Sequence, residues 1–152
     1  TVVFYDYSGA WAATAGNECE DRVDLSEGVF LVVGRAPAST PDGFYAEYFF
    51  MLDPDQPADA PVGRIAADGG LALTIETRGM VGGRRAEITY RLLLQPIKFS
   101  HVLVTSLTRT VRILSEPDSP AMSLDLLRER EPSAEVPALA ATGGKGLCLR
   151  RL

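Results

Sequence analysis

The sequence predicts an all-β fold, an antiparallel up-and-down β-barrel of about eight to ten strands that spans residues 1–152 as a single domain. Short segments with alternating apolar and polar residues recur along the chain, and turn signals separate them at hairpin spacing. The two cysteines lie near opposite ends of the chain, as expected if the first and last strands are neighbours in a closed sheet. A two-sheet β-sandwich is the structural alternative.

The first part of the chain predicts three strands after an opening segment. Residues 1–7 are β-prone on both faces and fit either a strand or a free apolar arm. Residues 11–15 begin with the only tryptophan, and a Gly-Asn turn signal follows them. Residues 19–25 alternate in polarity, which predicts a half-buried strand. Residues 29–33 are continuously apolar, which is typical of a strand covered on both faces.

Residues 44–52 form the most apolar segment of the chain, and both of their alternating faces are apolar except at Glu47. A strand in a one-sided sheet would carry polar residues at every second position. We therefore expect one face of this strand to line a barrel lumen and the other face to make a further contact. An acidic, proline-rich loop is expected at residues 53–61.

The middle of the chain predicts consecutive hairpins. The expected strands are residues 62–67, 71–78 and 84–94, separated by a turn at residues 68–70 and a glycine-rich connection at residues 79–83. The inward-facing residues predicted by the alternation are Leu71, Leu73, Ile75, Ile88, Tyr90, Leu92 and Leu94. Gln95 and Pro96 are expected to end the third strand.

The last part of the chain predicts a long strand and a short closing strand. Residues 101–114 are rich in Val, Thr, Leu and Ile and indicate one long bent strand. Residues 122–130 fit either a helix or a strand, and residues 131–146 indicate coil. Residues 147–152 predict the closing strand.

The charge pattern argues against nucleic acid and membrane partners. The net charge is −5, and residues 1–60 hold eleven of the twenty acidic residues but only two of the fifteen basic ones. Phosphate binding needs a concentrated basic face, so we expect no nucleic acid partner. The longest apolar candidate, residues 99–108, is much shorter than the roughly 20 residues of a membrane helix, so we expect no membrane span.

Cys19 and Cys148 are predicted to form one structural disulfide, because two widely separated cysteines suit neither a metal site nor a redox motif. A disulfide indicates an exported protein, either periplasmic or extracellular. Thr1, in place of an initiator methionine, is compatible with a removed export signal. The alternative is a pair of buried free thiols in a cytosolic protein.

The sequence predicts no catalytic residue, metal site or cofactor, and it favours a protein that is not an enzyme. The single histidine, His101, lies at an expected strand start, and no Gly-x-Ser-x-Gly elbow is present. Asp53, Asp55 and Asp59 lie close together in the sequence but lack the spacing and central glycine of an EF-hand loop. Residues 143–146 lack the Walker pattern of a phosphate-binding loop.

Gly9 and Trp11, at the entry to the first strand, resemble the Gly-x-Trp motif of lipocalins and other calycin barrels. The resemblance implies a lipocalin-like barrel whose tryptophan packs at the closed end. Residues 9–25 also resemble the small barrel inhibitors of secreted bacterial metalloproteases, which show Gly-x-Trp, a cysteine soon after, and a strand of alternating charge. In those inhibitors the N-terminal arm enters the protease cleft, which implies such a role for residues 1–7.

The predicted function is that of an exported small-molecule binding protein that holds an apolar or aromatic ligand in the barrel lumen. The expected ligand-binding residues are Tyr45, Glu47, Phe49 and Tyr90. Glu47 would meet a ligand group or a partner if it is buried, or it would point to solvent at the rim. Ordinary core packing is the alternative for the aromatic residues. The alternative functions are a protein-interaction module, such as an inhibitor of a secreted protease, and an isomerase or cyclase on a calycin-type barrel.

Overall fold

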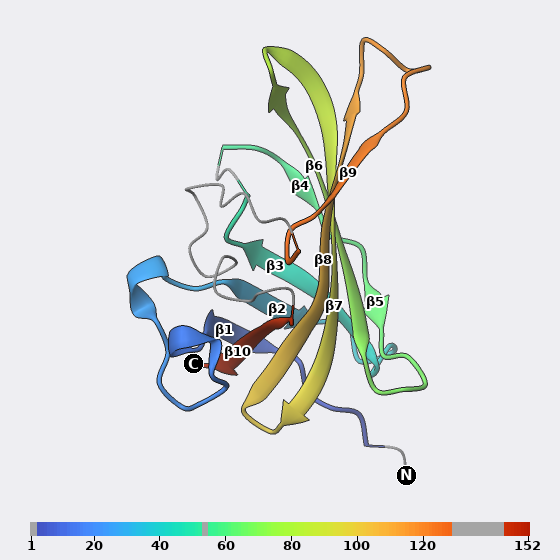
Figure 1. Cartoon of the computed structure of the whole chain (residues 1–152). Coiled ribbons are helices and arrows are strands. Elements are labelled where there is room, and N and C mark those ends of the chain that lie inside the picture. Colours follow the sequence, from blue (N-terminus) through green and yellow to red (C-terminus); the bar gives the residue numbers. More distant parts are fainter. Residues whose placement is uncertain (1–2, 53–54, 129–144) are drawn as a thin grey trace.

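The computed structural model describes residues 3–52, 55–128 and 145–152, and these form one antiparallel sheet that is curled into a half-barrel (Figure 1). The strands are β1 (Gly9–Ala13), β2 (Leu31–Arg35), β3 (Gly43–Phe49), β4 (Ala58–Asp59), β5 (Gly63–Arg64), β6 (Leu71–Val81), β7 (Arg84–Lys98), β8 (His101–Ile113), β9 (Met122–Asp125) and β10 (Leu147–Arg151). Short 3₁₀ turns, η1 and η2, occupy Ala15–Asn17 and Leu25–Glu27. The predicted all-β, antiparallel class is confirmed.

The strand order is β4-β6-β7-β8-β10-β1-β2-β3-β5, with β9 paired to β8. Neighbours in the sheet mostly follow chain order, as in an up-and-down meander. The C-terminal strand β10 lies between β8 and β1, so it joins the two halves of the chain. The two ends of the curl approach each other at an isolated bridge between Ile65 and Leu71. The described strands therefore belong to one curled sheet rather than to the two sheets of a sandwich.

Alternation of apolar and polar residues explains the inner and outer faces of the central strands. In β6, Leu71, Leu73 and Ile75 are buried, whereas Ala72 and Glu76, at alternate positions, are exposed. The inward residues predicted for β7 also lie inside, and they join one continuous core cluster. This outcome follows from the period of two in a strand, which places every second side chain on the same face.

Two predicted breaks in the hairpins are wrong because the strands continue through them. β6 runs to Val81, since Gly82 and Gly83 alone make the turn with the positive φ angles that a tight two-residue hairpin requires. β7 runs to Lys98, and Pro96 pairs with Val102 inside the ladder. A register shift next to Pro96 accommodates the proline, which lacks an N–H to donate.

The predicted strand at residues 19–25 is also wrong. This segment is a loop in which only Val23 pairs with Thr14, as an isolated bridge, and Cys19 has a positive φ of 58°. Its alternation is mostly between charged residues, so no apolar face drives it into the sheet. The disulfide and η2 shape the loop instead.

The ambiguous stretches have separate outcomes. Residues 122–125 form strand β9, while residues 129–144, which include most of the expected coil, lie outside the described residues. Residues 3–8 are neither a strand nor a free arm, because Tyr7 is completely buried at one end of the sheet; residues 1 and 2 lie outside the described residues.

The two ends of the curled sheet differ (Figure 1). We call the end that holds residues 3–8 and the turn between β7 and β8 the base. At the opposite end, β6, β7 and β8 extend together with β9 beyond β1, β2, β3 and β10, and β4 pairs with β6 where this part begins. We call this projecting part, residues 76–81, 84–89, 108–113 and 122–125, the wall.

Candidate ligand-binding site

Trp11 closes the base of the sheet. Its side chain is fully buried, and its indole Nε1 donates a hydrogen bond to the carbonyl of Tyr7 at 2.9 Å. The guanidinium of Arg151 lies 4.5 Å from the centre of the indole ring and donates hydrogen bonds to the carbonyls of Asp6 and Ser8. A buried aromatic ring, a stacked cation and two satisfied carbonyls leave this end of the sheet sealed. The role of Arg151 was not expected from the sequence.

Two tyrosines tie the N-terminal segment across the base. The Tyr7 hydroxyl donates to the carbonyl of Gly69 at 2.5 Å, and the Tyr5 hydroxyl donates to the carbonyl of Lys98 at 2.8 Å. Burial raises the pKa of both tyrosines above the ordinary value. Val3 and Phe4, which precede these ties, remain exposed.

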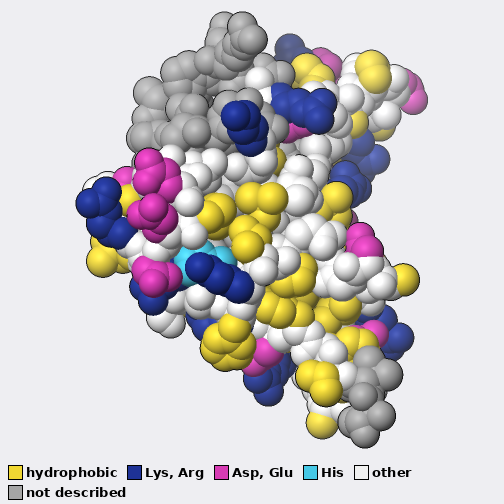
Figure 2. Space-filling model, turned by 60° about the horizontal axis from the view of Figure 1, so that its bottom comes forward, with side chains coloured by type: hydrophobic (Ala, Val, Ile, Leu, Met, Phe, Trp, Pro, Cys, Tyr) yellow, Lys and Arg dark blue, Asp and Glu magenta, His cyan; other side chains and the backbone are white. Residues whose placement is uncertain are grey.

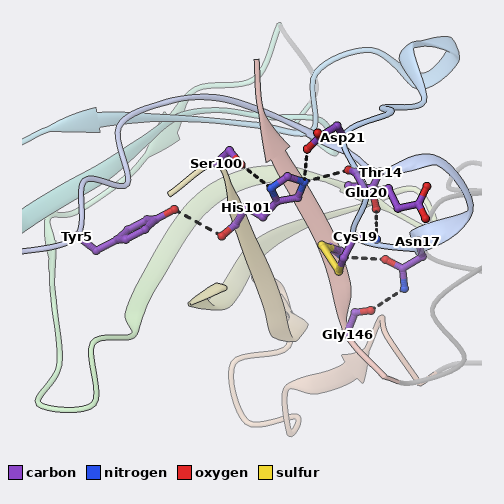
Figure 3. Close-up of a disulfide and its surroundings, with 10 residues drawn as sticks. Tyr5, Thr14, Asn17, Cys19, Glu20, Asp21, Ser100, His101 and Gly146 are labelled. Carbon is purple, nitrogen blue, oxygen red and sulfur yellow. Dashed lines mark hydrogen bonds and ion pairs between the residues drawn. A yellow bond between two sulfur atoms is a disulfide. The ribbon is translucent and has the colours of Figure 1, made fainter. Parts of the chain in front are cut away.

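The predicted disulfide between Cys19 and Cys148 is present, with a Cα–Cα distance of 5.3 Å (Figure 3). The Asn17 side chain supports it, since Nδ2 donates to the carbonyl of Gly146 at 2.9 Å and Oδ1 accepts from the backbone N–H of Cys148 at 2.7 Å. The Thr14 hydroxyl accepts from the backbone N–H of Cys19. The loop after β1 is thereby fastened to the last strand.

His101 holds the same loop to β8 and is fully buried (Figure 3). Its Nε2 lies 2.9 Å from the carbonyl oxygen of Glu20, which requires the hydrogen on Nε2, and its Nδ1 lies 2.7 Å from the Ser100 hydroxyl. Asp21 lies 3.8 Å from Nε2 but is mostly exposed. Because the carbonyl of Glu20 occupies Nε2, the geometry supports a structural role for the histidine.

The four predicted ligand-binding residues do not share one face. Tyr45 and Glu47 lie on the outside of β3, where the Tyr45 hydroxyl donates to Glu47 at 3.1 Å. This hydrogen bond raises the pKa of Tyr45. Phe49 and Tyr90 lie inside, with ring centres 5.2 Å apart.

A β-bulge at Glu47 explains the separation. Val32 pairs with Tyr48 and Val33 with Ala46, so Glu47 has no partner in the ladder, and the face of the following residues is reversed. The expectation that Tyr45, Glu47 and Phe49 share the lumen face is therefore wrong. Their part in ligand binding stays a prediction.

An aromatic cluster lies where the wall begins. Phe49 packs edge-to-face against Phe30, Phe50 and Tyr90, and Phe30 stacks on Phe50 with ring centres 4.4 Å apart. Tyr90 belongs to β7, the strand that continues into the wall. The cluster is thus continuous with the inner face of the wall.

The wall has one apolar and one charged face. Ile88 of β7 pairs with Thr77 of β6 and with Val111 of β8. These three residues lie on the inner face, next to Tyr90 on the side away from the base. On the outer face, Glu87 forms ion pairs with Arg78 and Arg112. The wall is therefore an amphipathic ribbon whose apolar side faces the same way as the core.

Arg109 stands on this inner face, which the sequence analysis missed. It pairs with Tyr90 on one side and Leu124 on the other, and directly paired residues point to the same face of a sheet. The alternation of Leu107, Arg109 and Val111 was the available signal, because an arginine at an apolar position of a strand is unusual.

Open grooves lie on the described part of the surface, and two of them involve the regions discussed above. The larger, of about 460 Å³, is lined by Pro57, Ala58, Asp59, Glu76, Thr77, Arg78, Glu87, Ile88 and Thr89. The smaller, of about 300 Å³, lies between the N-terminal segment and the start of β3. Within residues 3–52, 55–128 and 145–152, no group of histidine, cysteine and carboxylate side chains is arranged to hold a metal ion, and Asp53 lies outside this part.

Comparisons with known proteins supply no family. No family model matches the chain, and neither a curated protein nor a solved structure matches it. Within the described part of the chain, no helix has the length and apolar character needed to cross a membrane.

Proposed function

We propose that the chain is an exported binding protein that holds a small apolar or aromatic ligand against the inner face of the wall. The single observation that carries this proposal is the apolar inner face of the wall, which extends beyond β1, β2, β3 and β10 and is continuous with the aromatic cluster. An apolar face beside aromatic rings is the type of surface that small apolar ligands occupy.

The proposed ligand site lies farther from the base than the lumen expected from the sequence. Large, fully buried side chains fill the interior of the sheet near the base, among them Tyr7, Trp11, Leu71 and Leu94. Phe49 and Tyr90 remain candidates at the floor of the site, whereas Tyr45 and Glu47 face outward. The ligand would therefore rest on the aromatic cluster, with the wall along one side.

A lipocalin-like ancestry is part of the proposal. Gly9 and Trp11 stand at the start of β1, and a late arginine, Arg151, packs across the tryptophan at the sealed base. The buried position of this tryptophan at one end of the sheet supports the resemblance to the first-strand Gly-x-Trp of lipocalins. The Cys19–Cys148 disulfide supports an extracellular or periplasmic location, because disulfides persist in oxidising compartments.

A titration with N-phenyl-1-naphthylamine, a neutral apolar fluorophore, tests the proposal. We expect saturable fluorescence enhancement with the wild type, and weaker binding by Ile88→Gln, which places an amide on the inner face. The matched control is Thr89→Gln, the next residue in β7, whose side chain points to the outer face. Absence of saturable binding to the wild type, or equal affinities of both variants, would contradict the proposed site.

A protein-interaction function is the second candidate, and a different surface favours it. Leu93, Ile97 and Phe99 are exposed on the outer side of β7 and on its turn, with 81% of the Phe99 side chain accessible. Figure 2 shows hydrophobic side chains gathered on the face turned toward the base, beside the histidine. Inhibition of a secreted metalloprotease such as thermolysin by the wild type, and its loss in Phe99→Ser, would support this candidate. No inhibition would count against the protease-inhibitor form of it.

A further inference from the structure

We propose that the ligand is an amphipathic anion, whose acidic group is bound by Arg109 and whose apolar part lies against the wall and the aromatic cluster. This inference rests on the proposed function and names the ligand class for the same site. It begins from the position of Arg109 on an apolar face.

The register fixes the direction of Arg109. The residue lies between Leu107, which is fully buried, and Val111, which is 8% exposed, and all three occupy the inner side of β8. Its cross-strand neighbours Tyr90 and Leu124 point to the same side. The guanidinium therefore belongs to the apolar face of the wall and not to its charged outer face.

Arg109 lacks the ion pairs that three other arginines of the wall make. Arg78 and Arg112 pair with Glu87, and Arg84 pairs with Glu116, all on the surface. In the part of the chain that the structure describes, Arg109 makes no hydrogen bond or ion pair; its side chain is half-buried, and its buried Nε has no acceptor, as is also true of the Nε atoms of Arg150 and Arg151. A buried donor without an acceptor costs free energy.

The chemistry of the guanidinium selects the missing partner. It presents five N–H donors in a planar fork and stays charged at all physiological pH values, so it matches carboxylate, sulfonate or phosphate oxygens in pairs. Its neighbours Ile88, Val111 and Leu124 offer no acceptor in their side chains, and its cross-strand partner Tyr90 offers a hydroxyl but no acidic group. A ligand with one acidic group and an apolar tail or ring satisfies both the cation and the face around it.

The experiment compares two ligands that differ mainly in the head group. Dodecanoate and dodecanol each displace bound N-phenyl-1-naphthylamine from the wild type, from Arg109→Leu and from Arg112→Leu. The last variant is the matched control, because Arg112 lies on the same strand but on the outer face, where it pairs with Glu87. Far-ultraviolet circular dichroism checks that each variant is folded, and Arg109→Gln provides a second, polar replacement.

We expect the wild type and Arg112→Leu to bind dodecanoate about 10-fold to 100-fold more tightly than dodecanol, as hydrogen bonds to a charged group imply. Arg109→Leu and Arg109→Gln should lose this preference and keep their affinity for dodecanol. Equal affinity of the wild type for the two ligands, or an unchanged preference in both Arg109 variants, would overturn the inference alone. Failure of the fluorophore itself to bind would contradict the proposed function and the inference with it.

Discussion

The base and the wall are built from the same sheet, yet they use polar groups in opposite ways. At the base, Arg151 is stacked on Trp11 and bonded to backbone carbonyls, and the hydroxyls of Tyr5 and Tyr7 each have an acceptor. On the inner face of the wall, Arg109 lacks such partners among the described residues. The comparison suggests that one end of the sheet provides stability and the other provides a binding surface.

The two regions also differ in the sequence separation of their contacts. The base joins Tyr7 to Gly69 and Trp11 to Arg151, and the disulfide joins Cys19 to Cys148, so these contacts form only when distant parts of the chain meet. The wall consists of adjacent strands, two of them joined by a two-residue turn. Substitutions at the base should therefore lower the free energy of unfolding, while those on the inner wall should change binding.

The largest effect on stability is expected from removing the disulfide. In the chain-entropy model, a loop longer than 100 residues contributes about 4–5 kcal/mol, as an upper figure. Replacement of Cys19 and Cys148 by alanine should lower the urea midpoint accordingly. Thiol titration of the denatured, unreduced wild type provides the direct check, and two reactive thiols per chain would contradict the bond.

Trp11→Ala should lower the free energy of unfolding by about 3–5 kcal/mol, because it removes a large buried ring and leaves a cavity under Arg151. The matched control is Leu93→Ala on the outer face of β7, which should change stability by about 0.5 kcal/mol or less. Native fluorescence of Trp11 should be blue-shifted and resistant to iodide. Emission like that of free tryptophan would show that the base is open.

Tyr7→Phe tests the role of the base through the pH dependence of stability. The loss of one hydrogen bond should cost about 1 kcal/mol at neutral pH. Because the pKa of Tyr7 is raised in the folded state, its contribution is complete below the unfolded pKa of about 10 and is lost as pH rises through the folded value. The variant should thus lose less stability than the wild type at alkaline pH, in urea titrations from pH 7 upward. Parallel profiles would contradict this role.

The smallest loss of stability is expected from Asp6→Asn. It should lower the free energy of unfolding by about 1 kcal/mol or less, because Asp6 and its partner Arg35 are partly exposed. Burial acts to raise the pKa of Asp6, but hydrogen bonds from Ser8 and Arg35 outweigh it and lower the pKa. The contribution is therefore present above the unfolded pKa of about 4 and is lost as pH falls through the folded value. Urea titrations between pH 7 and pH 3 should converge for the two proteins, and a constant difference would refute the assignment.

The sequence predicted the parts of the fold that depend on local alternation. The inner residues of β6 and β7 follow from a period of two, the long strand β8 follows from its Val, Thr, Leu and Ile content, and the disulfide follows from the positions of two cysteines. The bulge at Glu47 could not be predicted, since one unpaired residue reverses a face without changing the composition of the segment. The stacking of Arg151 on Trp11 joins residues from opposite ends of the chain, which no local pattern indicates.

The candidate site was predicted only in part, for related reasons. Tyr90 lies inside because β7 keeps its predicted alternation, whereas Phe49 lies inside only because the bulge at Glu47 turns it inward. The wall itself was not anticipated, since the turn at Gly82 was placed too early and the strands were expected to be shorter. The arginine within an apolar alternation in β8 was visible in the sequence, but its significance depends on the neighbours that register brings to it.

The most direct test of the division between base and wall is a map of backbone amide chemical shifts during a titration with dodecanoate. The account predicts that the largest changes cluster at Ile88, Tyr90, Arg109 and Val111, while the amide of Trp11 stays unchanged. Changes confined to the base or to the outer face of β7, or no saturable change at any residue, would contradict it.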